Sequence, residues 1–306
     1  MMGLKIGDLY APVPVIQGGM GVGVSLSSLA GNVAKAGGIG IISTAQIGYR
    51  DPDFDVHPIP CNLKAIGEEI KKAREIADGG IVGVNIMVAT RQYEDYVKAA
   101  ADAGADLIIS GAGLPMTLPA AAPDSLLAPI VSSVKSLQVI LHYWQKKYNR
   151  KPDLVVIEGP RAGGHLGFSR EEIDSYTVTG TKNYDDEIKK IISLAKENDL
   201  PVVTAGGVYE RADMEHQLSL GADGVQIATR FVTTKECDAS DAYKQTYLDA
   251  KKEDIVIVSS PVGMPGRAIR NEFLERVTAE RDLWEAAEPV SRAVTRQRFR
   301  TASRRR

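Results

Sequence analysis

The feature that most limits the fold of this chain is a regular alternation of short strand patterns with amphipathic helix patterns. Short segments rich in Val and Ile predict strands over residues 13–17, 39–43, 81–86, 107–110, 128–131, 154–157, 202–204 and 224–227. Between them, apolar residues recur at i, i+3, i+4 and i+7 and predict helices over residues 25–36, 63–78, 92–103, 135–148, 184–198 and 211–220. Each helix carries the chain back, so the strands must run parallel. Eight such units predict an α/β protein with a (β/α)8 TIM barrel, because a doubly wound open sheet usually has fewer strands.

Two long segments interrupt this alternation, one after the second strand and one after the sixth. They are "IGYRDPDFDVHPIPCN" over residues 47–62 and "HLGFSREEIDSYTVTGTKNYD" over residues 165–185. In barrels the segments that follow strands build the active site, so both are predicted to be inserted active-site loops. We expect one barrel domain over residues 1–280 and a poorly ordered Arg-rich tail over residues 281–306.

Charge and hydropathy exclude several classes of partner. The chain has 37 Lys and Arg against 39 Asp and Glu, a net charge of -2, which argues against a nucleic-acid binder. No run approaches the roughly 18 apolar residues of a membrane span, and the first residues lack a leader pattern, so we expect no membrane partner and a cytoplasmic location. Cys61 and Cys237 lie far apart without a CxxC pattern, so neither a disulfide nor a metal site is expected. The expected partner is a small-molecule substrate, and a homodimer is left open.

The strongest chemical signal lies in "PVVTAGGVYERADMEHQLSLGADGVQIATRF", residues 201–231. Gly206 and Gly207 follow the seventh strand, and small residues also follow the eighth. Small residues let backbone N–H groups approach an anion, and the next helix adds the positive end of its dipole. Barrels form a phosphate site at this place. The alternative is tight packing of a helix on a strand, which also favours glycine.

The first strand ends in a second glycine-rich turn, from Gln17 through Gly18 and Gly19 to Met20. A Rossmann pyrophosphate fingerprint is excluded, because no acidic residue follows about twenty positions later, where residues 41–44 read IIST. Either the backbone of this turn lies flat under a planar ligand, with Met20 as a soft apolar contact, or it only leads the chain into the next helix.

Asn85, in the third-strand segment "GVNIM", places an amide at the expected mouth of the barrel. An amide can donate to and accept from a ligand whose edge alternates donors and acceptors, as that of a flavin does. Asn is also a common turn former, so this residue alone does not decide between the two interpretations.

Several motifs together closely resemble the nitronate monooxygenase family, formerly called 2-nitropropane dioxygenases. They are "VIQGGMG", "KAGGIGII", "GVNIM", "SGAG", "EGPRAGGHLG", "VVTAGGV", "GADGVQIATRF" and "GMPGRAIRN", and they occur in this order over residues 12–271. The same family contains FMN-dependent bacterial enoyl-acyl-carrier-protein reductases and NADH:quinone reductases. The AGGH loop and the segment ending in TRF are the most specific of these motifs.

The resemblance implies an FMN-containing barrel with His165 as the catalytic residue. The resemblance implies that the isoalloxazine ring meets Gly19, Met20, Asn85, Glu158 and Gly163, and that the phosphate is held by Gly206, Gly207, Ala228 and Thr229, with Gln226 nearby. Gln17 and Gly18 complete the expected cofactor-binding set. A glycine frame lets the His165 imidazole project over the flavin, and histidine exchanges protons near neutral pH. The alternative is a loop histidine that hydrogen-bonds its own backbone.

Two residues depart from the family pattern. Arg161 stands where relatives commonly have Glu, and its fixed positive charge either favours an anionic substrate or nicotinamide phosphates, or points to solvent. Ala228 replaces the usual Gly and keeps the N–H donor. The tail also lacks the cysteine-containing segment of similar relatives.

The expected activity is that of an FMN-dependent nitronate monooxygenase, which oxidises alkyl nitronates with O₂. The alternative is an NAD(P)H-dependent flavin reductase acting on an enoyl thioester or a quinone, with NAD(P)H as co-substrate, and a flavin-binding module without turnover is also considered. A nucleotide dehydrogenase of the inosine monophosphate type needs a cysteine on the loop after the sixth strand, where this chain has His165 and no cysteine. His57, His142 and His216 are expected on the surface.

Overall fold

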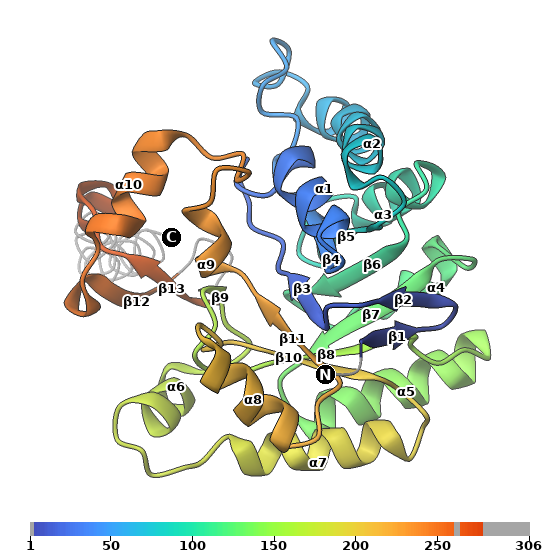
Figure 1. Cartoon of the computed structure of the whole chain (residues 1–306), viewed down its shortest axis with the longest axis vertical. Coiled ribbons are helices and arrows are strands. Elements are labelled where there is room, and N and C mark those ends of the chain that lie inside the picture. Colours follow the sequence, from blue (N-terminus) through green and yellow to red (C-terminus); the bar gives the residue numbers. More distant parts are fainter. Residues whose placement is uncertain (1–2, 260–263, 278–306) are drawn as a thin grey trace, which may run out of the picture. The chain divides into compact units, whose positions relative to one another are not determined.

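The computed structural model describes residues 3–259 and 264–277 of the chain. Eight parallel strands close into a barrel in the order β10-β11-β3-β4-β5-β6-β7-β8 (Figure 1). They are β3 (Val15–Gln17), β4 (Ile39–Ser43), β5 (Ile81–Met87), β6 (Leu107–Gly111), β7 (Leu126–Val131), β8 (Val155–Glu158), β10 (Val202–Ala205) and β11 (Gly224–Ile227). Each predicted strand corresponds to one of these, so the predicted (β/α)8 barrel is confirmed.

Helices follow the barrel strands and pack around them (Figure 1). They are α1 (Ser27–Lys35), α2 (Pro58–Ala77), α3 (Tyr93–Asp102), α4 (Leu118–Ala121), α5 (Val134–Tyr148), α6 (Arg170–Thr177), α7 (Asp185–Lys196), α8 (Arg211–Ser219), α9 (Thr229–Val232) and α10 (Asp241–Asp249). The predicted helices correspond to α1, α2, α3, α5, α7 and α8. Local sequence sets several ends: Ser133 begins α5 and Ser169 begins α6, each through a capping box.

The barrel has an apolar interior and a second apolar layer between strands and helices. Alternate residues of each strand point to opposite sides. The interior layer is built from Ile16, Ile39, Ile41, Leu107, Ile109, Val156 and Val203, all fully buried. A short hairpin, β1 (Leu4–Ile6) with β2 (Leu9–Ala11), adds Leu4, Ile6 and Ala11 to this interior cluster. A methyl on Gly7 in the hairpin would lie 3.2 Å from Leu126, the first residue of β7, so the hairpin covers the amino end of the barrel. The carboxyl end is left for a ligand.

The segment after β8 is an ordered insertion. It contains β9 (Gly164–His165) and α6, and three rings, Phe168, Tyr176 and Tyr184, pack edge to face with centroids 5.3–6.1 Å apart. Strand β9 pairs antiparallel with β13 (Pro265–Ile269), in a small sheet ordered β12-β13-β9 with β12 (Ile255–Ser259). These strands were not predicted, because they lie outside the repeating units of strand and helix on which the strand predictions depend.

The chain divides into two compact units. Of the described residues, the first unit comprises 3–249, 257–259 and 264–267, and the second comprises 250–256 and 268–277. The second unit contains a short 3-10 helix, Lys252–Asp254. The carbonyl of Asp254, its last residue, accepts a hydrogen bond from the N–H of Arg270 at 2.7 Å. The single domain over residues 1–280 stays a prediction, and the Arg-rich tail lies outside the described residues. Within residues 3–259 and 264–277, no helix has the length and apolar character needed to cross a bilayer.

Candidate functional site

Polar side chains replace the apolar interior layers at the carboxyl end of the barrel. Strand register pairs Glu158 of β8 with Ala205 of β10, and Ala205 with Gln226 of β11. Because Ala205 belongs to the interior cluster, Glu158 and Gln226 point inward at the same level. Asn85 of β5 is paired with Ile109 of the same interior cluster and therefore also points inward. Two amides and a carboxyl thus line the mouth of the barrel.

The segment between β3 and α1, residues 18–26, crosses this mouth, and we call it the glycine turn. A methyl on Gly19 would lie 2.5 Å from Cβ of Asn85, and one on Gly18 would lie 3.3 Å from Cγ of Gln226. Close approach therefore requires glycine at Gly19, and at Gly18 a side chain would be tightly packed. The structure brings together four residues that the sequence assigned to one site.

Gln17 and Met20, at either side of these glycines, are held by the protein itself. Gln17 is fully buried; its Oε1 accepts from the N–H of Ile41 at 3.0 Å and its Nε2 donates to the Ile41 carbonyl at 3.1 Å. This amide extends the pairing of β3 with β4, which leaves only the backbone of Gln17 for contact with a ligand. The N–H of Met20 donates to Ser25 Oγ at 2.8 Å, and the Met20 side chain packs on the cluster that contains Val24.

Backbone N–H groups converge at the ends of β10 and β11. Gly206 and Gly207 have φ of +96° and +84°, a region that favours glycine. Among the described residues, none accepts a hydrogen bond from the N–H of Gly206, Gly207, Ala228 or Thr229. The start of α8 is different, because Asp213 Oδ2 already accepts from the N–H of Glu210 at 2.9 Å. An anion here would meet the strand-end amides rather than the first turn of α8.

The loop that carries His165 lies against these strand ends. A methyl on Gly206 would lie 2.9 Å from the N–H nitrogen of Ala162, and one on Gly163 would lie 3.9 Å from Thr229 Oγ1. His165 is half-buried and pairs with Gly266 of β13. The structure therefore brings the AGGH loop next to the residues expected around the phosphate.

Arg267, which sequence reasoning missed, ties this loop down. Its Nη1 donates to the carbonyls of Pro160 at 2.9 Å and Ala162 at 2.5 Å. Burial lowers the pKa of Arg267, and the nearby Arg161 guanidinium lowers it further. No local pattern could have indicated this residue, because its partners lie more than a hundred positions away in sequence.

Two ionisable residues at the mouth of the barrel, Glu158 and Arg161, lie in different surroundings. Burial raises the pKa of Glu158 to about 7. No described residue donates a hydrogen bond to its carboxyl or forms an ion pair with it. The exposed Arg161 lies on Gly207, where a glycine methyl would be 3.0 Å from the Arg161 Cβ. The Glu158 carboxyl thus lies near the apolar interior layer of the barrel, and the Arg161 guanidinium lies beside the residues expected around the phosphate.

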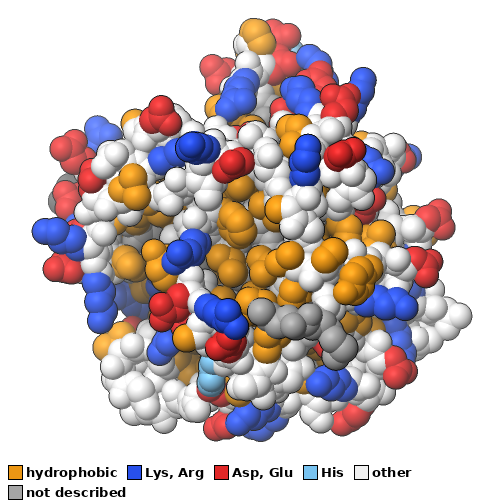
Figure 2. Space-filling model, in the orientation of Figure 1, with side chains coloured by type: hydrophobic (Ala, Val, Ile, Leu, Met, Phe, Trp, Pro, Cys, Tyr) orange, Lys and Arg blue, Asp and Glu red, His pale blue; other side chains and the backbone are white. Residues whose placement is uncertain are grey.

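The donor set fits a flavin mononucleotide. Gln226 Oε1 is buried and has no hydrogen-bond partner among the described residues, so it is available to a ligand N–H. Asn85 supplies a second amide, the glycine turn supplies a flat backbone, and the strand-end amides suit a phosphate. On the face drawn in Figure 2, hydrophobic side chains gather in the middle of the molecule, around β3.

The other histidines lie elsewhere, as expected. His57 precedes α2, His142 lies on α5 and His216 lies on α8, and all three are exposed. His216 Nε2 is 2.9 Å from Asp185 Oδ2. Among the described residues, no cluster of three or more His, Cys, Asp or Glu side chains could hold a metal ion.

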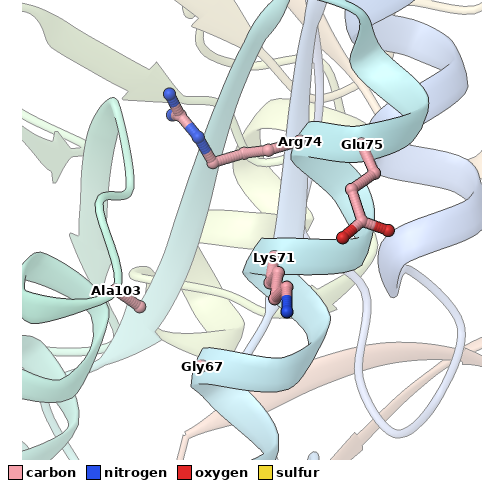
Figure 3. A pocket seen from close by; sticks show the side chains of 5 residues that line it. All are labelled: Gly67, Lys71, Arg74, Glu75 and Ala103. Atoms are coloured by element: carbon pink, nitrogen blue, oxygen red, sulfur yellow. The ribbon is translucent and has the colours of Figure 1, made fainter.

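A separate surface hollow lies beside α2 and the end of α3 (Figure 3). Its lining residues are Gly67, Lys71, Arg74, Glu75 and Ala103. Arg74 is already paired with Asp106 Oδ1 at 2.8 Å and with the Gly104 carbonyl at 2.9 Å. The polar groups of this hollow are therefore engaged by the protein or solvated, and the hollow is not part of the candidate site.

The chain is similar to proteins of one known family. The model of the family described as "Nitronate monooxygenase" matches residues 5–298. A protein of Staphylococcus saprophyticus named "Probable nitronate monooxygenase" is 25% identical over 292 residues, covering 89% of this chain and 79% of that protein.

Two solved structures are similar to the barrel. FabK from Thermotoga maritima is 25% identical, with a TM-score of 0.66, over 87% of this chain and 73% of that one. Nitroalkane oxidase from Streptomyces ansochromogenes is 21% identical, with a TM-score of 0.68, over 86% and 78%, and supports the fold alone.

Proposed function

Since the chain belongs to the nitronate monooxygenase family and is a flavin-dependent oxidoreductase, we propose that it binds FMN and oxidises alkyl nitronates with O₂. Two observations at the mouth of the barrel carry this proposal. The inward-facing amides of Asn85 and Gln226 meet the glycine turn, and four N–H groups at nearby strand ends have no partner among the described residues. These groups would hold the ring and the phosphate of one planar, anionic cofactor. When bound, FMN supplies the electron acceptor that O₂ regenerates.

The protein's own residues would bind and orient the two reactants. Gly206, Gly207, Ala228 and Thr229 would receive the FMN phosphate through their N–H groups. The side-chain Oε1 of Gln226 would accept a hydrogen bond from an N–H of the flavin ring. The apolar interior layer of the barrel and the AGGH loop would exclude water.

We assign the proton-handling role to His165. It lies on β9 within a glycine frame, next to the loop that reaches Gly206 and Thr229. An imidazole here could polarise the substrate or take its proton. Arg161 would attract an anionic substrate such as a nitronate toward the site.

A second candidate is an NAD(P)H-dependent flavin reductase acting on an enoyl thioester or a quinone. The exposed Arg161 on Gly207 supports it as well as the nitronate proposal, because a guanidinium beside the phosphate site also suits the phosphates of a nicotinamide cofactor. A cytoplasmic location and a homodimer are further proposals from the sequence.

The absorption spectrum of the protein with FMN tests these proposals. Flavin bands that bleach anaerobically with propionate-3-nitronate, and more slowly in His165→Ala, are expected for the monooxygenase. Bleaching by NADH and none by the nitronate would instead support the reductase. Failure to take up FMN would contradict both.

A further inference from the structure

The first amides of α1 are capped from distant parts of the chain. The N-cap residue Leu26 has no side chain that can accept, and the first turn of α1 contains no acidic residue. Helix starts normally use a local Ser, Thr, Asp or Asn for this purpose. This cap lies where the glycine turn runs into α1.

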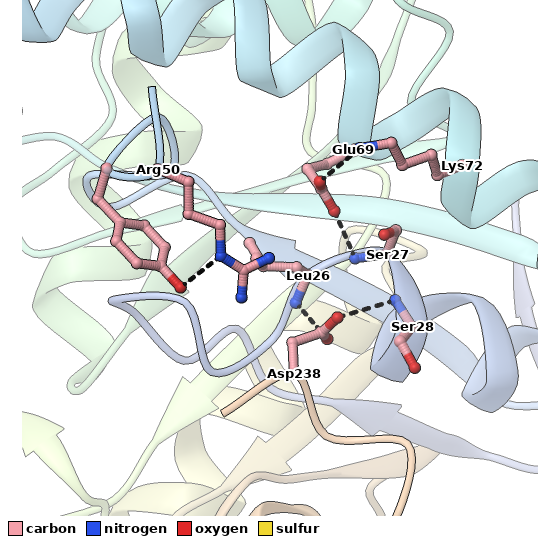
Figure 4. A network of polar contacts seen from close by, with 8 residues as sticks. Leu26, Ser27, Ser28, Arg50, Glu69, Lys72 and Asp238 are labelled. Carbon is pink, nitrogen blue, oxygen red and sulfur yellow. Dashed lines mark hydrogen bonds and ion pairs between the residues drawn. The ribbon is translucent and has the colours of Figure 1, made fainter. Parts of the chain in front are cut away.

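Asp238 supplies most of this cap (Figure 4). Its Oδ2 accepts from the N–H of Leu26 at 2.8 Å and of Leu29 at 3.1 Å, and its Oδ1 accepts from the N–H of Ser28 at 3.1 Å. The remaining N–H, of Ser27, donates to Glu69 Oε2 of α2 at 2.9 Å. Four successive amides are thus satisfied by two carboxylates, and Asp238 takes three of them.

The same segment holds the glycine turn from its other side. Cys237 Sγ and the backbone N–H of Asp238 both lie 3.2 Å from the carbonyl of Val24. Ser25, the next residue, is fully buried, and its N–H donates to the Met20 carbonyl at 3.0 Å. Two hydrogen bonds, one from Asp238 to Val24 and one from Ser25 to Met20, therefore connect Asp238 to Met20 through the peptide bond that joins Val24 to Ser25.

We propose that Asp238 is a positioning residue for the glycine turn, fixing Gly18, Gly19 and Met20 where they meet the flavin ring. The inference rests on the proposed FMN site. It goes beyond that site because Asp238 lies outside it and acts only through the backbone it anchors. A carboxylate that accepts three amides holds them more firmly than one short polar cap would. The turn has glycines at Gly18, Gly19, Gly21 and Gly23, so without this anchor it has much conformational freedom.

The test compares Asp238→Ala and Asp238→Asn with Glu69→Gln. Glu69→Gln is the matched control, because it weakens the cap of the same helix without touching the segment that holds Val24. We would measure backbone hydrogen exchange over residues 18–25 without ligand, and then the FMN dissociation constant and the visible circular dichroism of bound FMN.

Asp238→Ala is expected to speed exchange over residues 18–25, weaken FMN binding about tenfold and change the flavin dichroism. Asp238→Asn keeps one acceptor and should give a smaller change of each kind, which also provides a variant if the alanine protein does not fold. Glu69→Gln should leave exchange over residues 18–25 and the dichroism as in the wild type.

Unchanged exchange over residues 18–25 in both Asp238 variants would overturn the proposal. So would equal effects of Asp238→Asn and Glu69→Gln, since these would show only a general loss of stability. If the wild type takes up no FMN while exchange still responds to Asp238, the anchor holds and the proposed function fails.

Discussion

A methyl group on Gly19 would lie 2.5 Å from Cβ of Asn85, so the glycine turn and the end of β5 are in direct contact across the mouth of the barrel. Real Cβ atoms do not approach so closely, and one of the two backbones would have to move. Neither residue alone identifies a flavin site, because a glycine turn and a strand-end Asn both have ordinary structural explanations. Their contact makes a shared surface for one ligand.

Gly19→Ala should therefore damage cofactor binding. The added methyl pushes the turn away from Asn85, and overpacking of this kind costs about 1–3 kcal/mol, so FMN binding should weaken by about tenfold or more. Gly67→Ala on α2 is the control, because nothing lies within 4 Å of its new methyl. Titration of FMN fluorescence would measure both. Equal FMN affinity in the two variants would contradict this contact as part of the site.

Glu158 gives a prediction about pH. Its pKa in the folded chain is about 7, against an ordinary 4.5, because of burial. Below pH 4.5 the carboxyl is protonated in both states; between pH 4.5 and 7 only the unfolded chain releases the proton, so stability falls as pH rises through this window. At about 1.4 kcal/mol per unit, the loss has an upper bound of roughly 3 kcal/mol.

Glu158→Gln removes this dependence. In urea unfolding of the flavin-free protein, its stability relative to the wild type should improve by about 2 kcal/mol from pH 5 to pH 8, since other titrating groups cancel in the comparison. Glu75→Gln, an exposed change on α2, should show no such trend. A Glu158→Gln difference that is the same at both pH values would show that the carboxyl is ionised normally.

A comparison of Ala substitutions at Gly206 and Gly104 separates the effect of backbone strain from the effect of contact with the AGGH loop. Gly206 and Gly104 both have positive φ, +96° and +79°, so Ala at either position costs about 1–2 kcal/mol in strain. Only at Gly206 would the methyl also meet Ala162, at 2.9 Å, whereas at Gly104 nothing lies within 4 Å. Thermal unfolding should show losses in both variants, and the FMN affinity should fall only in Gly206→Ala. A parallel fall in affinity would mean that stability alone controls binding.

Arg267→Met should loosen the loop that carries His165. The change removes the donors to the carbonyls of Pro160 and Ala162 and leaves these acceptors partly buried. We expect faster proteolysis within residues 159–167 and a lower kcat with a nitronate, with FMN still bound. Arg74→Met removes an exposed pair and serves as the control. Unchanged proteolysis would show that pairing of β9 with β13 is sufficient to hold the loop.

The sequence predicts the barrel well because each βα unit is a local pattern. It also places Glu158 at the end of β8 and Asn85 and Gln226 close to the ends of β5 and β11. It does not predict the roles of Arg267 and Asp238, which depend on partners more than a hundred positions away. It could not show that the Gln17 amide is used within the barrel wall, because that depends on where β3 ends beside Ile41.

Arg161→Glu distinguishes the two candidate activities, because it reverses the charge beside Gly207. The exposed guanidinium lies on Gly207 and forms no ion pair with any described residue, so its charge acts on whatever approaches the phosphate side. Reversal of that charge should raise KM about tenfold for an anionic substrate, and the increase should shrink at high salt. KM for a neutral quinone should change little. Arg211→Glu on α8, also exposed, controls for net charge. A rise in KM for the nitronate, with no effect of NADH on the flavin, would mean that the Arg161 charge serves nitronate binding. A rise in KM for NADH would mean that it serves the nicotinamide phosphates. If neither KM changes, Arg161 faces solvent without a role in binding.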